Sequence, residues 1–232
     1  MLTDTAEALQ NKVETLREKR QRAQRRREYE ASQGTLKDTR ESLQELVKRH
    51  VLFDSNGIPC EHDDANISKT RDKLQTVRNH FKDSPEWIIE EDLRTGFLEW
   101  IDEHEEDLRK ALAEAWGEYY QEKVTNISQD LLDALDKIER FENSVDEIRS
   151  FKSSLAEWHR NVPSTQPDLD AFEEKAEELE TTWEEISRDL SGDIKVFLRA
   201  TVSGGAPLEL VTNNVREWLK KHDLHDQATV HF

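Results

Sequence analysis

The segment Leu169–Leu190 reads LDAFEEKAEELETTWEEISRDL, and its apolar residues recur at alternating intervals of three and four positions. This spacing places one apolar stripe along an α-helix, and it is the heptad period of coiled coils. Ten acidic residues and only two basic residues lie between Asp168 and Leu190. The segment therefore predicts a strongly acidic amphipathic helix that packs along one face.

The partner predicted for this helix directly precedes it in the sequence. The same alternation of four and three positions runs through Ile127, Leu131, Ala134, Ile138, Phe141, Val145 and Ile148. Pro163 and Pro167 then end the helical pattern and allow the chain to reverse. The sequence thus predicts an antiparallel helical hairpin with its turn near 161–167.

The first arm of this hairpin is expected to be long. No proline lies between Glu86 and Val162, so one helix is expected from about Phe97 to Arg160. Three places offer a bend or a break, because glycine and short polar residues weaken a helix interior. They are Gly96, Gly117 and the pair Thr125-Asn126.

Another heptad pattern begins at the N-terminus. Its inner positions are Leu2, Ala6, Leu9, Val13, Leu16, Arg20, Ala23 and Arg27. The seam is apolar for about two heptads and then becomes basic, and arginine at such positions sets like charges together in a parallel homodimer. An acidic partner helix suits this seam better. Gly34 interrupts the pattern, which resumes at Leu36 and continues to about His50.

Residues 51–66 are predicted to form the first loop, because they contain the turn pair Asn56-Gly57 and Pro59. A short helix is expected from about Ile67 to Phe81. Its inward side chains are expected to be Leu74, Val77 and Phe81. The next helix is expected to start at Ser84-Pro85-Glu86, with serine as the N-cap and proline at the first helical position.

The C-terminal segment 191–232 is denser in apolar residues and surrounds the turn sequence Ser203-Gly204-Gly205-Ala206-Pro207. Thr212 is the expected N-cap of a helix that reaches about His222. Residues 228–232 are expected to form a lone strand. Together these features predict a small compact unit with the spacing of a helix-turn-helix.

The fold class predicted is therefore all-α. Long antiparallel helices with coiled-coil heptads form an elongated bundle or hairpin, and a small helical unit follows at the C-terminus. The expected organisation is a basic coiled-coil arm at 1–50, a loop at 51–66, a helical bundle with the hairpin at 67–190, and the C-terminal unit at 191–232.

The composition, the charge and the missing motifs of the chain limit the classes of function that it can have. The chain has 34% hydrophobic and 36% charged residues and a formal net charge of −18, so it can bury narrow stripes but not a thick round core. Residues 1–50 nevertheless carry 12 Lys/Arg against 9 Asp/Glu. The sequence holds no glycine-rich phosphate loop, and no His follows a Glu three positions earlier. These absences disfavour nucleotide-binding and di-iron enzymes.

The basic arm is the main candidate contact site. Seven basic side chains fall within Leu16–Arg27, namely Arg17, Lys19, Arg20, Arg22, Arg25, Arg26 and Arg27. Clustered arginine on a helix suits an acidic protein surface or nucleic acid phosphates. The alternative is a charged coiled-coil arm that docks on this protein's own acidic helices or on a neighbouring subunit. In the C-terminal unit, Arg216, Lys220 and Lys221 are weaker candidates, because neighbouring acidic residues dilute their charge.

Two groups of potential metal ligands are present, and a structural or solvated role is expected for both. The first is Cys60, His62, Asp63 and Asp64, and the second is His222, Asp223, His225, Asp226 and His231. Zinc usually takes four nitrogen or sulfur ligands, and the only cysteine lies in the first group. No cofactor is therefore predicted.

The function expected from the sequence is that of a non-enzymatic scaffold or assembly subunit of a larger complex. Its partners are expected to be proteins, with no membrane span, and homo-oligomerisation stays open. A nucleic-acid-associated accessory subunit is the alternative, and a metal-dependent enzyme is a more distant one. The single cysteine fits a reducing compartment, so a cytoplasmic location is expected.

Overall fold

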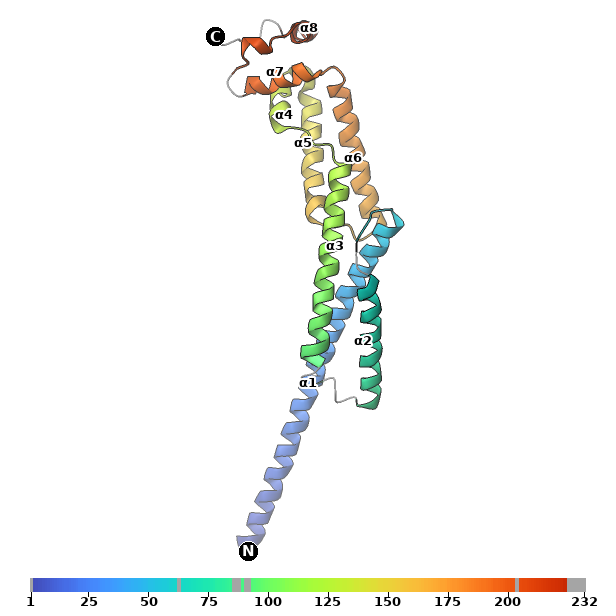
Figure 1. Ribbon diagram of the computed structural model, residues 1–232. Helices are drawn as coiled ribbons and strands as arrows, with labels where there is room; N and C mark the ends of the chain where they lie inside the picture. Colours follow the sequence, from blue (N-terminus) through green and yellow to red (C-terminus); the bar gives the residue numbers. More distant parts are fainter. Residues whose placement is uncertain (1, 62–63, 85–88, 90–92, 203–204, 225–232) are drawn as a thin grey trace. The chain divides into compact units, whose positions relative to one another are not determined.

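The computed structural model describes residues 2–61, 64–84, 89, 93–202 and 205–224, and the side chains of some helical residues near these gaps are not described. Within this part of the chain all regular secondary structure is helical (Figure 1). The all-α prediction is confirmed. The chain divides into two compact units, Met1–Glu114 and Ala115–Phe232.

Helix α1 (Leu2–Ser55) is the longest element of the first unit, with 54 residues. It passes through Gly34 without a break, although an interruption was expected there. A single glycine costs a helix only about 1 kcal/mol relative to alanine, and the helical residues on both sides outweigh that cost. At 1.5 Å per residue α1 extends for roughly 80 Å.

The expected loop 51–66 is shorter than predicted, because α1 continues to Ser55. Gly57 ends the helix with a φ of 69°, a left-handed conformation that glycine adopts without strain. The amide of Ile58 donates a hydrogen bond to the carbonyl of Phe53 at 2.9 Å. The amide of Gly57 donates one to the carbonyl of Asp54 at 3.2 Å. This is a Schellman motif, and its usual apolar pair is present because Phe53 and Ile58 are both buried.

Helix α2 (Asp64–Asp83), the π-helical turn η2 (Leu93–Leu98) and the first part of α3 (Glu99–Lys123) complete the first unit. Phe97 and Ile101 form a buried cluster against which Leu43, Val77, Leu98 and Trp100 pack. The predicted inward face of α2 is therefore only partly correct. Val77 reaches this cluster, whereas Leu74 and Phe81 remain 46% and 45% exposed. The expected helix start at Ser84-Pro85-Glu86 lies largely outside the described residues.

The second unit shows that the expected long helix is interrupted twice. Residues 124–128 separate α3 from α4 (Gln129–Leu135), at the Thr125-Asn126 pair that was one of the predicted break points. A second break at 136–138 precedes α5 (Glu139–Arg160) and was not expected. The apolar positions from Ile127 to Ile148 are buried all the same.

Helices α5 and α6 (Gln166–Ser187) pack against each other. The hydroxyl of Thr165 accepts a hydrogen bond from the amide of Asp168, which caps the N-terminus of α6, and a proline lies in its first turn. The apolar stripe of α6 that faces the core comprises Leu169, Phe172, Ala176, Leu179 and Ile186. Trp183 has the same spacing, but it is only half-buried, and the ammonium of Lys195 lies 5.7 Å from its ring centroid.

An aromatic cluster joins the end of α3 to these two helices. The indole of Trp116 is buried and donates to the carbonyl of Trp158 at 2.8 Å. Its ring meets that of Phe172 edge to face, with centroids 4.7 Å apart. The hydroxyl of Tyr119 donates to the carboxylate of Glu173. Burial, with this hydrogen bond, raises the pKa of Tyr119.

The C-terminal part of the second unit comprises α7 (Gly192–Val202), the short 3-10 helix η3 (Leu208–Leu210) and α8 (Asn213–Lys221). Thr212 caps α8, as predicted, by accepting a hydrogen bond from the amide of Val215. Helix α7 packs against α4 and against α8. The strand expected at 228–232 lies outside the described residues.

Among the described residues, none of the helices has the length and apolar character that crossing a membrane requires.

Candidate interaction surface

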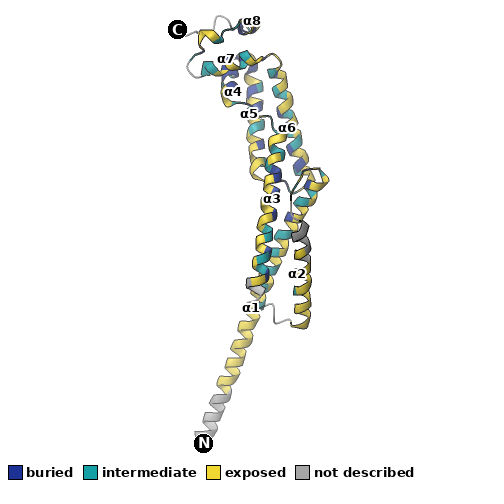
Figure 2. Cartoon of the chain, viewed as in Figure 1, coloured by how far each residue is buried: buried dark blue, intermediate teal, exposed yellow. Residues whose placement is uncertain are grey.

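The described side chains of the N-terminal part of α1, which begin at Lys12, are exposed on every side of the helix. From Lys12 to Glu28 each described side chain is exposed to solvent, as the uniform colour of this segment in Figure 2 shows. All seven basic residues predicted as contacts lie in this stretch, which we call the basic arm (Lys12–Glu28). They are Arg17, Lys19, Arg20, Arg22, Arg25, Arg26 and Arg27. All seven of these side chains are thus exposed to solvent.

Acidic residues on the same helix neutralise the arm only in part. Arg22 pairs with Glu18 at 3.8 Å, and Arg26 pairs with Glu30 at 2.9 Å, each one helical turn away. Both pairs are largely exposed. Such pairs contribute about 0.3–0.5 kcal/mol, so a partner with stronger acidic contacts can displace them.

The apolar seam of the arm is exposed as well. Val13 is 45% exposed and Leu16 is 65% exposed. Arg20, Ala23 and Arg27 continue the same face and are also exposed. The side chains of Leu2, Ala6 and Leu9 are outside the described set. Among the side chains that are described, none covers the seam.

A second accessible surface lies where α1, α2 and α3 meet. It is a groove of about 550 Å³ whose apolar lining includes Leu36, Leu43, Val47, Leu74, Phe97 and Ile101. Arg40 and Lys48 also line the groove. Leu43, Phe97 and Ile101 form the floor, because they belong to the buried cluster of this unit. Val47 and Leu74 are about half exposed and form the walls.

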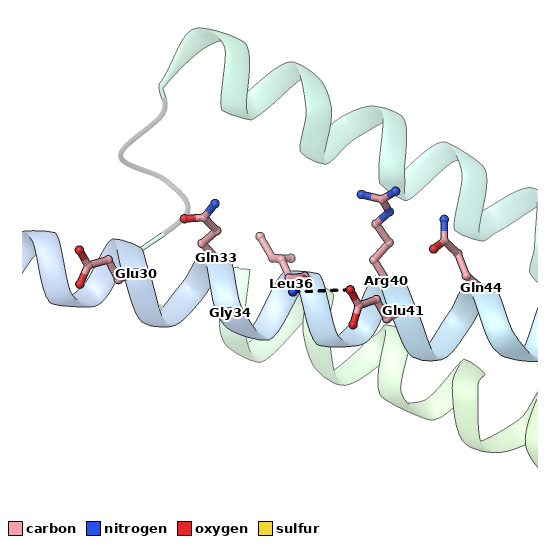
Figure 3. A pocket seen from close by; sticks show the side chains of 8 residues that line it. Glu30, Gln33, Gly34, Leu36, Arg40, Glu41 and Gln44 are labelled. Carbon is pink, nitrogen blue, oxygen red and sulfur yellow. Dashed lines mark ion pairs between the residues drawn. The ribbon is translucent and has the colours of Figure 1, made fainter.

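A more polar hollow of about 660 Å³ continues along α1 from this groove. The two hollows share Leu36, Arg40 and Gln44. In Figure 3 the side chains of Gln33, Arg40 and Gln44 lie on the side of α1 that faces α2. Lys37 pairs with Glu41 at 3.7 Å, but Arg40 has no ion-pair partner among the described residues.

The sequence did not identify the groove as a site, although it holds the signal. Residues 36–53 contain more large apolar side chains than one seam can bury: Leu36, Leu43, Leu46, Val47, Val51, Leu52 and Phe53. Leu46 and Phe53 are buried, whereas Val47 and Val51 remain exposed. An apolar surplus in one helix segment indicates a second apolar face.

The weaker candidates in the C-terminal unit are only partly free. Arg216 and Lys220 are exposed on α8, whereas Lys221 pairs with Asp189 at 2.6 Å. A connection at 203–212, which contains η3, separates α7 from α8. The turn of a DNA-binding helix-turn-helix has only 3–4 residues. The geometry therefore does not support α8 as a DNA-reading helix.

His222, one of the predicted metal-ligand group, is instead half-buried and packs against aromatic side chains of α5 and α8. Its ring centroid lies 4.8 Å from that of Trp218 and 5.6 Å from that of Phe141. Its Nδ1 lies 3.2 Å from the guanidinium of Arg140. Burial, followed by the charges of Arg140 and Lys221, lowers the pKa of His222. His225, Asp226 and His231 lie outside the described residues.

The other potential ligand group contains Cys60, which is half-buried beside the turn that ends α1. Burial raises the pKa of its thiol, which disfavours the thiolate that a metal requires. His62 and Asp63 are outside the described residues, as is the side chain of Asp64. Among the residues that the structure describes, no three His, Cys, Asp or Glu side chains gather as a metal site.

Comparison with known proteins adds no assignment to this geometry. No family model, no curated protein and no solved structure matches the chain.

Proposed function

We propose that this chain is a non-enzymatic scaffold or assembly subunit of a larger cytoplasmic complex, and that its basic arm contacts an acidic protein. The observation that carries the proposal is the full exposure of Lys12–Glu28, with seven basic residues and the apolar pair Val13 and Leu16. A helix without tertiary contacts is marginal in water, because most helical stability in proteins comes from packing. A partner that covers the arm supplies that packing.

The spacing along the arm supports a coiled coil with an acidic helix. Val13, Leu16 and Ala23 offer apolar positions, whereas Arg20 and Arg27 place charge within the seam. Two copies of this arm in parallel bring these arginines together, which is unfavourable, whereas glutamates on a different helix pair with them. The assembly contact is thus proposed to be heteromeric.

Nucleic acid is the second candidate partner of the arm. The observation in its favour is that all seven basic side chains of the arm are exposed. They can therefore contact phosphates, and such contacts need no apolar surface. Arg216 and Lys220 add exposed charge in the second unit. The exposed Val13 and Leu16 favour the protein partner, since a phosphate backbone does not bury them.

The experiment compares two variants of the full chain as baits in affinity capture from the native source. The arm variant replaces Arg20, Arg22, Arg25, Arg26 and Arg27 with glutamine, which has nearly the helix propensity of arginine. The matched control removes the same charge elsewhere by replacing the exposed residues Lys110, Lys123, Lys137, Arg160 and Arg188 with glutamine. Quantitative mass spectrometry and nuclease treatment then separate protein partners from nucleic acid.

The proposal predicts that the arm variant loses a defined acidic protein that the wild type and the control variant both retain, with or without nuclease. Binding of the purified partner is expected to weaken as salt rises, mostly through slower association. Loss of nuclease-sensitive material alone supports the nucleic-acid alternative. Capture of the same proteins and of the same amount of nucleic acid by the arm variant contradicts both functions of the arm.

A further inference from the structure

The groove between α1, α2 and α3 is a second surface that lacks a cover in the first unit. Its walls expose Val47 at 54% and Leu74 at 46%, above a floor of buried side chains. Val51 follows one turn after Val47, and Phe81 follows one turn after Val77, and both are exposed. Soluble surfaces rarely gather apolar side chains in a hollow unless something binds there.

The face of α1 that borders the groove continues onto the basic arm. Residues of this face follow one another at intervals of three and four positions: Arg22, Arg26, Tyr29, Gln33, Leu36, Arg40, Gln44 and Val47. This spacing keeps them on one side of an α-helix. The face is apolar near Val47 and basic near Arg22, so one ligand can meet both surfaces along a length of roughly 38 Å.

The charge of the walls indicates what kind of ligand fits. The two charged residues that line the groove, Arg40 and Lys48, are both basic. Lys48 pairs with Glu45 at 2.6 Å. Arg40 has no ion-pair partner among the described residues. An acidic ligand is therefore attracted to this part of the chain, whereas a basic one is repelled.

A second copy of the chain does not supply such a ligand. Its basic arm has the wrong charge for these walls. The apolar stripe of its most acidic helix, α6, is already buried in the second unit. Outside the arm and the residues in and next to the groove, the exposed large apolar side chains of the described chain are Val196 and Leu208, which do not form a stripe.

We infer that the groove binds an acidic amphipathic helix from another protein, with its apolar residues between Val47 and Leu74 and its carboxylates against Arg40, Arg26 and Arg22. The inference rests on the proposed assembly function and names the chemistry of the partner. Apolar residues of the bound helix recur at intervals of three and four positions over about three turns, which is the usual pattern of a helix in a groove.

A synthetic peptide tests this inference on the full chain. The probe is a fluorescent 24-residue helical peptide, with leucines in phase over one half and glutamates on its remaining positions. Two further peptides serve as specificity controls, one with lysine for glutamate and one with the leucines out of phase. Fluorescence anisotropy measures their affinities for the wild type, Val47→Glu, Leu74→Glu and the matched control Val196→Glu, whose native valine is 48% exposed.

The acidic in-phase peptide is expected to bind the wild type and Val196→Glu equally and to bind Val47→Glu and Leu74→Glu about tenfold or more weakly, because a buried glutamate costs the complex its apolar contact. The native side chains at both sites are half exposed, so the variants are expected to keep the wild-type circular dichroism and melting temperature. Unchanged affinity in both groove variants, equal binding of the lysine peptide, or no binding of the acidic peptide overturns the inference. Self-association that Val47→Glu abolishes, without peptide binding, assigns the groove to a second copy and overturns it too.

The outcome is separable from that of the proposed function. If Val47→Glu and Leu74→Glu still capture a partner that the arm variant loses, the proposed role of the arm stands and only the inference about the groove is contradicted. If peptide binding depends on Val47 but the arm variant captures the same partners as the wild type, the groove inference stands and the proposed role of the arm is contradicted.

Discussion

The arm of α1 and helix α6 have the same apolar period, but only α6 is covered. The stripe of α6 contains Leu169, Phe172 and Leu179, which are fully buried. The corresponding positions of the arm include Val13 and Leu16, which are exposed. A heptad pattern therefore specifies which face of a helix is apolar. It does not specify whether the helix that packs against this face belongs to the same chain.

The side chains of the two regions explain the difference. Every inner position of α6 is apolar, so packing on α5 removes a large apolar area from water at about 25 cal/mol per Å². In the arm, Arg20 and Arg27 occupy two inner positions and Ala23 another. Burial of those arginines against an apolar surface within the chain leaves their charge unpaired, which is unfavourable.

The sharpest test of this comparison is truncation of one inner residue in each region. Phe172→Ala is expected to destabilise the second unit by about 3–5 kcal/mol, because the ring is fully buried against Trp116, Tyr119 and Tyr120. Leu16→Ala is expected to change the free energy of unfolding by under about 0.5 kcal/mol. Urea unfolding followed by tryptophan fluorescence measures both, and equal effects break the comparison.

A smaller effect is expected at the cap of α8, where the second unit is again held by contacts within the chain. Thr212→Val removes the acceptor for the amide of Val215 and the donor to the carboxylate of Asp193, which lies 2.6 Å from the hydroxyl. Loss of such a cap costs about 1 kcal/mol. Thermal unfolding compared with the exposed control Thr181→Val measures the cost. Identical melting temperatures for the two variants contradict the assigned cap.

The same carboxylate gives a pH dependence. Hydrogen bonds from Ser191 and then Thr212 lower the pKa of Asp193 to about 2. A depressed folded-state pKa stabilises the fold above the ordinary value of about 4, and this contribution is lost as the pH falls toward 2. Asp193→Asn is therefore expected to be less stable than the wild type at pH 6, with the difference narrowing between pH 4 and pH 2. Urea titrations across this range measure it, and a constant difference contradicts the cause assigned.

The sequence predicts helices and caps in this chain better than it predicts their environment. The cap at Thr212 and the break near Thr125-Asn126 depend on the residues at those positions, so the local sequence is sufficient to predict them. Burial depends on neighbours that are distant in the sequence. Trp183 keeps the heptad spacing but is only half-buried, and Leu74 lines a groove instead of filling a core.

The candidate site divides in the same way. The basic arm is visible in the sequence, because seven basic residues within a short stretch need no tertiary information. The groove is not visible, since Leu43 of α1 and Phe97 of η2 meet only when these two elements fold together. The continuous passage of α1 through Gly34 was missed because one glycine weakens a helix without necessarily ending it.

The central claim is that the arm is uncovered in the free chain and obtains its cover from a partner. Hydrogen–deuterium exchange of the isolated full-length protein at low concentration tests it directly, because exchange rates report local opening. Amides of residues 12–28 are expected to exchange about a hundredfold or more faster than the central amides of α5 and α6. Protection of the arm equal to that of α6 contradicts the account, because it means that the arm already has its cover.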